Sequence, residues 1–458
     1  MTFSIVILAA GQSKRMRSAV PKIAHPLAGK PLLEHVLSTV TQLHPDQPPI
    51  VVYGYQGELI QRTFKHLSVT WVHQSEPLGT GHAVQQALPK LTQQDRTLIL
   101  YGDVPLISQA TLEHLLSSTP QHALGIITAQ LADPTGLGRI IRDEQERILK
   151  IVEEKDATPA ERKLHEINTG IYLIPTAYLQ ASLPLVKNHN AQQEYYLTDI
   201  IGLAIQDGMT IHSISPAYPE EILGVNNRVQ LAQLERFYQK KCAESIMLEG
   251  VTLLDPTRFD LRGELTAGQD VTIDINVILE GRVVLGDRCH IGPNTLLRNV
   301  TLGHDVDVKA NSIIEGAAIA SHCIIGPFAR IRPGTQLGMQ SHVGNFVEIK
   351  NAQIGAYTKM NHLSYIGDSL IGNHVNIGAG TITCNYDGVK KHQTLIGDYA
   401  FIGSATQLVA PVRIGENATI GAGSTITRDA PANQLTLCRT EQRTIEKWQR
   451  PMKEERES

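Results

Sequence analysis

Apolar and polar positions follow two different periods along this chain, and the period changes near residue 250. In the first half, short apolar runs alternate with amphipathic segments such as 32–43 and 82–88. The runs that predict buried strands are 4–10 (SIVILAA), 49–55 (PIVVYGY), 69–74 (VTWVHQ), 97–103 (TLILYGD) and 124–131 (LGIITAQL). This alternation predicts a mostly parallel sheet covered on both faces, whose ligands bind beyond the carboxyl ends of the strands.

Residues 226–250 have helical spacing and mark the end of the first domain. Val229, Leu234, Phe237 and Cys242 fall roughly on one helical face, and Gly250 is a stop signal. We therefore predict a domain at 1–225, a linking helix at 226–250 and a second domain at 251–458.

The second half repeats every six residues, a period that fits neither an α-helix nor an alternating strand. The apolar positions of the two clearest runs are Ile319, Ile325, Ile331, Leu337, Val343 and Ile349, then Ile396, Ile402, Leu408, Ile414, Ile420 and Ile426. Such a repeat predicts a β-solenoid whose apolar residues point into a narrow prism. A glycine often follows the apolar residue, and we expect it to supply corner conformations closed to bulkier residues.

The hexapeptide repeat is interrupted by 383–394 (TCNYDGVKKHQT), and the spacing shortens to five from Ile349 to Ile354 and from Ile366 to Ile371. Function is often placed where a regular scaffold is broken by a loop. The insertion is therefore a candidate functional segment.

The composition is that of an ordinary soluble protein. The 458 residues carry a net charge of -4, with 19% charged and 42% apolar residues, which predicts two or three domains and no nucleic-acid partner. The scattered cysteines contain no CxxC pair and predict reduced thiols in a cytoplasmic protein. We expect neither export nor a membrane span, because the N-terminus lacks a basic leader and no stretch approaches 18 apolar residues.

Four cationic side chains, Lys14, Arg15, Arg17 and Lys22, follow Gly11 directly after the first predicted strand. They form either a solvated basic loop or a phosphate cradle at a strand-to-helix turn. The stretch is neither a Walker A sequence nor a GxGxxG sequence, so any argument for the cradle depends on the cations.

A set of motifs in one order resembles a known family. LAAGQSKRMRSAVPK, EPLGTGHAV, LYGDVPLI, DPTGLGRI, EINTGIYL and GVNNR resemble sugar-1-phosphate nucleotidyltransferases. GPFARIRPG, VGNFVEIKNA, NHLSYIGD, GAGTITCNYDG and GSATQLVAPV then resemble hexapeptide-repeat acetyltransferases. Together they resemble the bifunctional bacterial N-acetylglucosamine-1-phosphate uridyltransferase / glucosamine-1-phosphate acetyltransferase family, over nearly the whole chain before about Arg443.

The resemblance implies a Rossmann-like nucleotidyltransferase domain followed by a left-handed parallel β-helix. The implied product is UDP-N-acetylglucosamine, made from glucosamine-1-phosphate, acetyl-CoA and UTP with Mg²⁺ and used in peptidoglycan and lipopolysaccharide synthesis. The sequence departs from the family's G-x-G-[ST]-R-M at 11–16 (GQSKRM), where Ser13 and Lys14 replace the second glycine and the small hydroxyl residue. This change bears on how closely the backbone approaches the phosphates.

In the first domain, we expect Arg15 and Lys22 to offset charge on the triphosphate. Asp103 is the oxygen ligand expected for Mg²⁺, with Asn226 as its partner by resemblance. The residues implied to hold the uracil are the backbone of Leu8, Ala9, Ala10 and Gly11 with Gln74, Gly79 and Thr80. Tyr101 and Gly102 are implied to bind substrate as well. Those implied to hold the N-acetyl sugar are Gly138, Glu153 and Asn168.

In the second domain, an unprotonated amine must attack a thioester, so a base that titrates near neutral pH is useful. We expect His362 to be that base, with Glu348 orienting or charging its imidazole. The resemblance implies that the phosphate of glucosamine-1-phosphate is bound by Arg332 and Lys350, and the sugar by Tyr365 and Asn376. The implied acetyl-CoA site comprises Ala379, Asn385, Tyr386, Ser404, Ala422 and Arg439. By the same resemblance the solenoid forms a homotrimer.

Two other functions are compatible with parts of the sequence. The first is a single-activity sugar-1-phosphate nucleotidyltransferase with a non-catalytic, oligomerising solenoid. The second is a solenoid metal enzyme of the γ-carbonic anhydrase kind, or a structural scaffold. The metal enzyme would need three histidines across adjacent coils, and the candidates are His304, His322, His342, His362 and His374.

Substitution of Asp103 by alanine should abolish uridylyl transfer while leaving acetyl transfer intact, because only the first reaction needs its carboxylate as a metal ligand. Release of pyrophosphate and of thiol, followed separately, tests this. Pyrophosphate release at a near-normal rate would show that the metal assignment is wrong.

Overall fold

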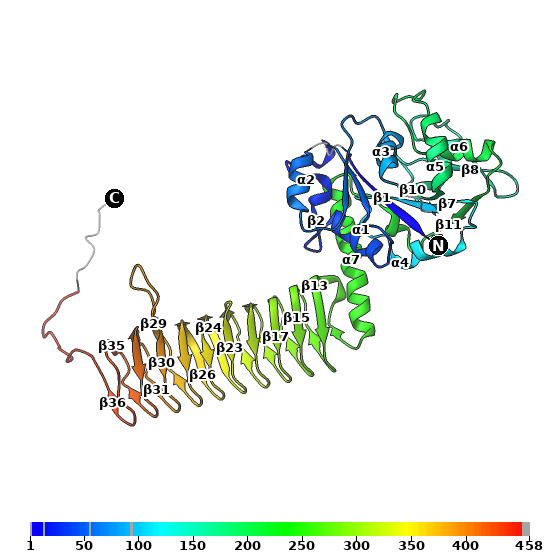
Figure 1. The fold of residues 1–458 in the computed structure, drawn as a ribbon. Coiled ribbons are helices and arrows are strands. Elements are labelled where there is room, and N and C mark those ends of the chain that lie inside the picture. The colour runs from blue at the N-terminus through cyan, green and yellow to red at the C-terminus, as the bar shows by residue number, and fades with distance from the viewer. Residues whose placement is uncertain (1, 12–13, 55, 92–94, 451–458) are drawn as a thin grey trace, which may run out of the picture. The chain divides into compact units, whose positions relative to one another are not determined.

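The computed structural model describes residues 2–11, 14–54, 56–91 and 95–450, and the chain divides into two compact units, 1–241 and 242–458 (Figure 1). Each unit has its own core. Among the described helices, none has the length and the apolar composition needed to cross a membrane.

Unit 1 is built on a sheet with the strand order β11-β7-β10-β6-β1-β4-β5. The bounds are β1 Phe3–Ala9, β4 Ile50–Tyr53, β5 Thr70–His73, β6 Arg96–Tyr101, β7 Leu124–Gln130, β10 Glu166–Pro175 and β11 Ile211–Ile214. Each predicted apolar run overlaps one of these strands. The sheet is mixed, because β10 runs antiparallel between β6 and β7. An antiparallel hairpin of β8 (Arg139–Arg142) and β9 (Ile148–Val152) attaches to β10.

Helices cover both faces of this sheet, as predicted. Figure 1 shows α3, α5 and α6 on one side and α1 and α4 on the other. The bounds are α1 Leu32–Thr41, α2 Gly57–Thr63, α3 Thr80–Ala87, α4 Gln109–Ser118, α5 Thr176–Ser182 and α6 Asp199–Gln206. Side chains of β1 alternate between two buried clusters: Ile5 and Ile7 pack with α1 and α4, and Val6 and Leu8 pack with α3, α5 and α6. Burial on both faces explains why the strand is a continuous apolar run.

The helix predicted at 226–250 lies at α7, Arg228–Leu248, and crosses the boundary between the units. Leu234 is buried in unit 1, and Ala243 and Ile246 are buried in unit 2. Val229, which was predicted on the same helical face as Leu234, is instead 66% exposed. It precedes Leu234 by five residues, which places it about 140° around the helix from that side chain.

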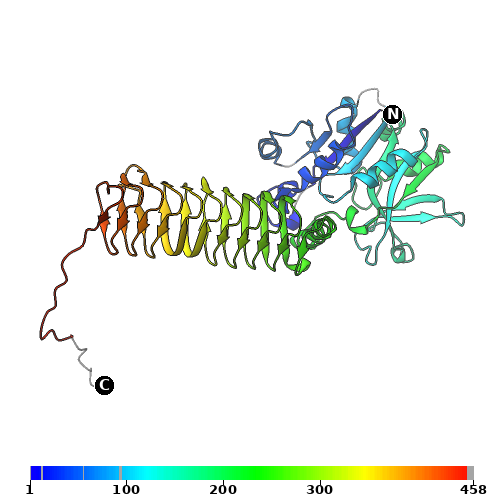
Figure 2. The ribbon, with the colours of Figure 1, turned by 90° about the horizontal axis from the view of Figure 1, so that it is seen from below.

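In the described part of unit 2, 25 strands form one parallel sheet wound into a β-helix (Figures 1 and 2). Its first strands are β12 Thr252–Leu253, β13 Phe259–Ala267, β14 Thr272–Ile273, β15 Val277–Leu285, β16 His290–Ile291, β17 Leu296–Leu302, β18 Asp307–Val308, β19 Ile313–Glu315, β20 Ala317–Ile319, β21 Ile324–Ile325, β22 Arg330–Ile331 and β23 Thr335–Leu337. The others are β24 His342–Lys350, β25 Gln353–Ile354, β26 Lys359–Gly367, β27 Ser369–Ile371, β28 Asn376–Ile377, β29 Ile382–Cys384, β30 Thr394–Ile396, β31 Phe401–Ile402, β32 Gln407–Val409, β33 Val412–Ile414, β34 Thr419–Ile420, β35 Thr425–Ile426 and β36 Leu435–Thr436.

The period of six is confirmed in both runs. The twelve predicted core residues are all buried, with Ile331 and Ile349 completely inaccessible. The interruption is visible in the register: Ile354 pairs with Ile371, 17 residues on, whereas Ile371 pairs with Ile396, 25 residues on. The difference of eight residues (25 − 17) is the insertion, which leaves the coil between Cys384 and Thr394.

Most glycines after the apolar residues serve a different purpose from the one predicted, although Gly326, after Ile325, is left-handed as expected, with a φ of 91°. Many corners with left-handed backbone carry bulky residues instead, including Phe346 and Tyr357. Gly338 and Gly355 are not left-handed, but a Cβ at either one would lie about 2.5 Å from the backbone of the next coil. Close stacking of the coils therefore requires glycine at these two positions.

Candidate active sites

The first candidate site lies where β1 and β6 end side by side. Leu8 pairs with Tyr101, and the Gly102 N–H donates to the Leu8 carbonyl at 2.9 Å. Beyond them is a cavity of about 770 Å³, bounded on one side by the backbone of 8–11 and on the other by Tyr101 and Asp103. Its position at the carboxyl ends of neighbouring parallel strands agrees with the predicted location.

One end of the cavity is formed by Gln74, Gly79 and Thr80. The buried Gln74 amide donates to the Gly79 carbonyl at 3.1 Å and contacts His82 Nδ1 at 3.0 Å, which holds the carboxamide in orientation. Gly79 has a φ of 108°, and a Cβ there would lie 2.6 Å from the Tyr195 carbonyl oxygen. Glycine is therefore required at this turn.

The other end of the cavity gathers charged groups from three distant segments. Lys22 Nζ contacts the Asp103 carboxylate and lies 3.3 Å from Asn226 Oδ1. Arg15 donates to the same amide oxygen at 3.0 Å but is not among the residues that line the cavity. The structure thus brings together Arg15, Lys22, Asp103 and Asn226, as the sequence predicted.

Asp103 and Asn226 form a donor set that suits Mg²⁺. Their backbones are joined, because the Val225 N–H donates to the Asp103 carbonyl at 2.9 Å. A carboxylate oxygen and an amide oxygen at an open cavity are hard ligands that leave room for water and phosphate oxygens. Gln12 and Ser13 lie outside the described residues, as does the side chain of Lys14, so their predicted influence on the phosphates remains a prediction.

Gly138, Glu153 and Asn168 converge beside the cavity. The Asn168 N–H donates to the Gly138 carbonyl at 2.9 Å, and a Cβ on Gly138 would lie 3.4 Å from Glu153 Oε2. Asn168 Oδ1 accepts from the Tyr172 hydroxyl at 2.9 Å. Burial raises the pKa of Glu153, and the Thr198 hydroxyl, which donates to it at 3.3 Å, partly offsets this rise.

Several residues that line the cavity were not predicted from the sequence to bind substrate. Arg17, Pro77 and Glu194 are among them. Arg17 was named only as one of four cations, and its left-handed backbone, with a φ of 48°, is not visible in the sequence. Glu194 reaches the cavity because the Tyr195 backbone bonds to Leu78 and Gly81, a contact without any local sequence signal.

The second candidate site lies on neighbouring coils of unit 2. In the pairing of β24 with β26, Asn345 lies opposite His362, and Glu348 lies opposite Tyr365. Glu348 accepts from Arg332 at 2.8 Å. No hydrogen bond between Glu348 and His362 occurs among the contacts of the described residues, so the predicted pairing of these two side chains stays a prediction.

A group of cations surrounds this site. The pKa of Lys350 is lowered, chiefly by Lys391 and further by Arg332, while Asp368 acts in the opposite direction. Lys391 belongs to the insertion, which folds back through a bridge between Tyr386 and Lys391. Lys391 was not predicted from the sequence as a site residue, although the interruption of the repeat marked its segment. Like charges held this close form a site for an anion.

The residues predicted for acetyl-CoA form a column on successive coils. The Ala405 N–H donates to the Ala379 carbonyl, and the Gly423 N–H donates to the Ser404 carbonyl. Arg439 donates to the Ala422 carbonyl at 3.2 Å. Asn385, at the start of the insertion, donates to the Asp368 carboxylate, and Tyr386 forms a bridge with Lys391. Asn376 lies on β28, paired with Lys359 and Phe401.

The alternative metal enzyme needs converging ligands. Across the part of the chain that the structure describes, no group of three or more His, Cys, Asp or Glu side chains is arranged to hold a metal ion.

Comparisons with known proteins match different families to different parts of the chain. The MobA-like NTP transferase domain family matches residues 5–166, the GMPPB C-terminal domain family matches 261–345, and the bacterial transferase hexapeptide family, with six repeats, matches 393–428. A relative from Janthinobacterium sp. (strain Marseille), named bifunctional protein GlmU, is 53% identical over 98% of this chain and 99% of its own length. A relative of the same name from Methylococcus capsulatus is 54% identical over 99% of this chain and 98% of its own length.

Replacement of Glu153 by glutamine should stabilise unit 1 at neutral pH. Because the native pKa is raised, the native state holds a proton that the unfolded state releases, so the free energy of unfolding falls as pH rises above the ordinary glutamate pKa. The neutral amide avoids this cost and can still accept from Thr198. We expect a higher midpoint of thermal unfolding at about pH 7.5 and little change near pH 4.

Circular dichroism at both pH values provides the measurement, with the exposed Glu144→Gln variant as the matched control. An equal shift of the midpoint at both pH values would contradict the explanation by burial.

Proposed function

The chain belongs to the bifunctional GlmU family, and from this premise we propose which residues carry each of its two reactions. It is an enzyme of UDP-N-acetylglucosamine synthesis. One activity transfers an acetyl group from acetyl-CoA to glucosamine-1-phosphate, and the other transfers a uridylyl group from UTP to N-acetylglucosamine-1-phosphate. We assign uridylyl transfer to unit 1 and acetyl transfer to unit 2.

In uridylyl transfer, a phosphate oxygen of the sugar phosphate bonds to the α-phosphorus of UTP, and the bond to the departing pyrophosphate breaks. This reaction needs alignment and charge neutralisation more than covalent help. Lys22 and Arg15 exchange their contacts with Asp103 and Asn226 for contacts with phosphate oxygens. Asp103 and Asn226 are then available to hold Mg²⁺, which supplies further neutralisation of the triphosphate when bound.

The two ends of the cavity align the substrates. The backbone of 8–11 with Gln74, Gly79 and Thr80 holds uracil, because a primary amide offers both a donor and an acceptor to an imide edge. Gly138, Glu153 and Asn168 hold the N-acetyl sugar. Tyr101 lines the cavity at the end of β6, and Gly102 follows it; we assign both to substrate binding.

In acetyl transfer, the amine nitrogen of glucosamine-1-phosphate bonds to the thioester carbonyl carbon, and the carbon–sulfur bond breaks to release the CoA thiol. His362 takes the proton that the amine loses. Arg332, Lys350 and Lys391 bind the phosphate, and Tyr365 and Asn376 bind the sugar. Glu348 supplies negative charge to the same site, in contact with Arg332 and available to His362.

Acetyl-CoA occupies the column of Ala379, Ser404 and Ala422, with Asn385 and Tyr386 beside it and Arg439 placed to bind a CoA phosphate. We further propose that the enzyme is a homotrimer, because a flat face of the solenoid prism is more stable packed against another subunit than exposed to water. We also propose that it acts in the cytoplasm.

The observation that carries the assignment of acetyl transfer to unit 2 is the closeness of Lys350 to Lys391 and Arg332, next to the paired strands β24 and β26 that carry Glu348 and His362. The test supplies purified protein with glucosamine-1-phosphate, acetyl-CoA, UTP and Mg²⁺ and follows thiol and pyrophosphate separately. Release of both, with UDP-N-acetylglucosamine as the product, is the expected result. Pyrophosphate release only when N-acetylglucosamine-1-phosphate is supplied would instead show a single-activity nucleotidyltransferase.

Substitution of Lys391 by alanine should raise the KM for glucosamine-1-phosphate about tenfold, the effect of losing one charge-assisted contact to phosphate. Uridylyl transfer should not change. The neighbouring Lys390→Ala variant removes the same charge from the insertion and serves as the matched control. Steady-state assays of thiol release measure this KM. An unchanged KM in Lys391→Ala would show that Lys391 does not bind the phosphate.

A further inference from the structure

A short hairpin follows the Lys22 turn in unit 1. Its strands are β2 (Pro26–Leu27) and β3 (Lys30–Pro31), and its tip is Ala28 and Gly29. Ala28 is left-handed, with a φ of 48°. This conformation is unfavourable for a residue with a Cβ, and it persists only where surrounding contacts impose it.

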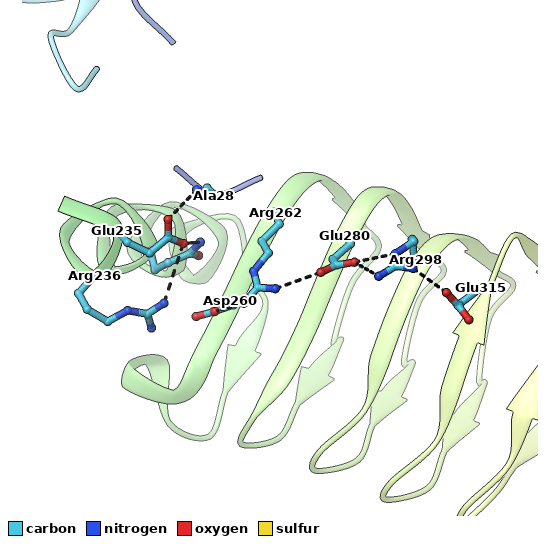
Figure 3. Close-up of polar contacts among 9 residues, drawn as sticks. Ala28, Glu235, Arg236, Asp260, Arg262, Glu280, Arg298 and Glu315 are labelled. Atoms are coloured by element: carbon cyan, nitrogen blue, oxygen red, sulfur yellow. Dashed lines mark hydrogen bonds and ion pairs between the residues drawn. The ribbon is translucent and has the colours of Figure 1, made fainter. Parts of the chain in front are cut away.

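The contact at this tip comes from α7, 207 residues away in sequence. Glu235 Oε2 accepts the Ala28 N–H at 2.6 Å (Figure 3). The same carboxylate accepts from Gln239 at 2.9 Å and lies 4.0 Å from Arg236, so its orientation is set from its own helix. Around the contact, Leu27 and Leu32 of the hairpin region pack with Leu234 of α7 in one buried cluster.

Each partner of this contact is connected by hydrogen bonds to the end of the cavity that contains Lys22, Asp103 and Asn226. On the hairpin side, the His25 N–H donates to the Lys22 carbonyl and the His25 carbonyl accepts from Leu32, both at 3.1 Å. On the helix side, the Asn226 N–H donates to Gln230 Oε1 at 2.8 Å, which joins Asn226 to the first turn of α7. The Glu235–Ala28 bond therefore closes a ring of contacts that contains Lys22 and Asn226.

We propose that Glu235 is a positioning residue for uridylyl transfer. Its carboxylate, held on the Ala28 N–H, sets the separation between Lys22 on one side and Asn226 with Asp103 on the other. The proposal rests on the proposed roles of Lys22 and Asn226 toward the triphosphate. It identifies a residue outside the cavity lining whose loss misplaces two groups inside the site.

The test compares Glu235→Ala, Glu235→Gln and the exposed Gln233→Ala control on the same helix, all in the full chain. Amide hydrogen exchange of the peptide 24–33, followed by mass spectrometry, reports the hairpin directly. We expect Glu235→Ala to speed this exchange and to lower the kcat of uridylyl transfer, each about tenfold, the scale of one lost charge-assisted bond. Glu235→Gln keeps an acceptor oxygen and should retain most of the activity.

Two further measurements separate positioning from misfolding. Acetyl transfer, measured on the same samples, should be unchanged in every variant. Adding Ala28→Gly to Glu235→Ala should restore part of the lost kcat, because glycine adopts the left-handed turn without the carboxylate. Glu235→Ala with faster hairpin exchange but an unchanged kcat would overturn the proposal, and so would a lower kcat with unchanged exchange.

Failure of the underlying function is distinguishable from failure of this proposal. If Lys22→Ala retained full uridylyl transfer, the assigned role of Lys22 would be wrong and the positioning proposal would fall with it. If Lys22→Ala is inactive and Glu235→Ala behaves as wild type, only the positioning proposal is overturned.

Discussion

Parallel strand pairing in a fixed register is the constraint on which both candidate sites depend. In unit 1, the pairing of β1 with β6 sets Leu8 beside Tyr101 and so brings the backbone of 8–11 to the strand end that carries Asp103. In unit 2, the pairing of β24 with β26 sets Glu348 beside Tyr365 and Asn345 beside His362. A shift of one residue would turn each of these side chains to the other face of its strand.

The sites differ in how they depart from this regular pairing. Unit 1 adds long loops at the ends of its strands, and contacts such as Tyr195 with Gly81 hold those loops in place. Unit 2 has few loops, because each coil stacks directly on the next and some glycines are needed merely to allow that approach. A solenoid of this kind can gain a new functional group through an insertion, and Lys391 reaches Lys350 in this way.

Charges in unit 2 are organised along the outer surface of the solenoid as well as at the site. Figure 3 shows Arg262, Glu280, Arg298 and Glu315 linked on successive coils, with Arg298 bound to Glu280 at 2.6 Å and to Glu315 at 2.7 Å. Opposite charges alternate along this row. Equivalent positions of successive coils lie next to each other, so side chains of the same charge would repel one another. At the candidate site this alternation ends, since Lys350 meets both Lys391 and Arg332, and only Asp368 and Glu348 supply carboxylates against these three cations. The excess positive charge at that point is what suits the site to a phosphate.

Much of the architecture could be predicted from the sequence alone because it depends on local periods. The alternation of apolar runs and amphipathic segments predicted the covered sheet, and the period of six predicted the solenoid with Ile331 and Ile349 inside it. The motifs also predicted that Lys22, Asp103 and Asn226 belong to one site, although 204 residues separate the first from the last.

The tertiary structure decided the features that depend on strand order and on contacts between distant segments. The antiparallel direction of β10, the approach of Lys391 to Lys350, the pairing of Glu348 with Arg332 and the bond from Glu235 to Ala28 have no local signal. The role of glycine was mistaken for the same reason, because the clash that excludes a Cβ comes from the next coil. A sequence period determines which face of an element is buried, whereas the neighbour that each exposed group meets is determined only when the elements pack together.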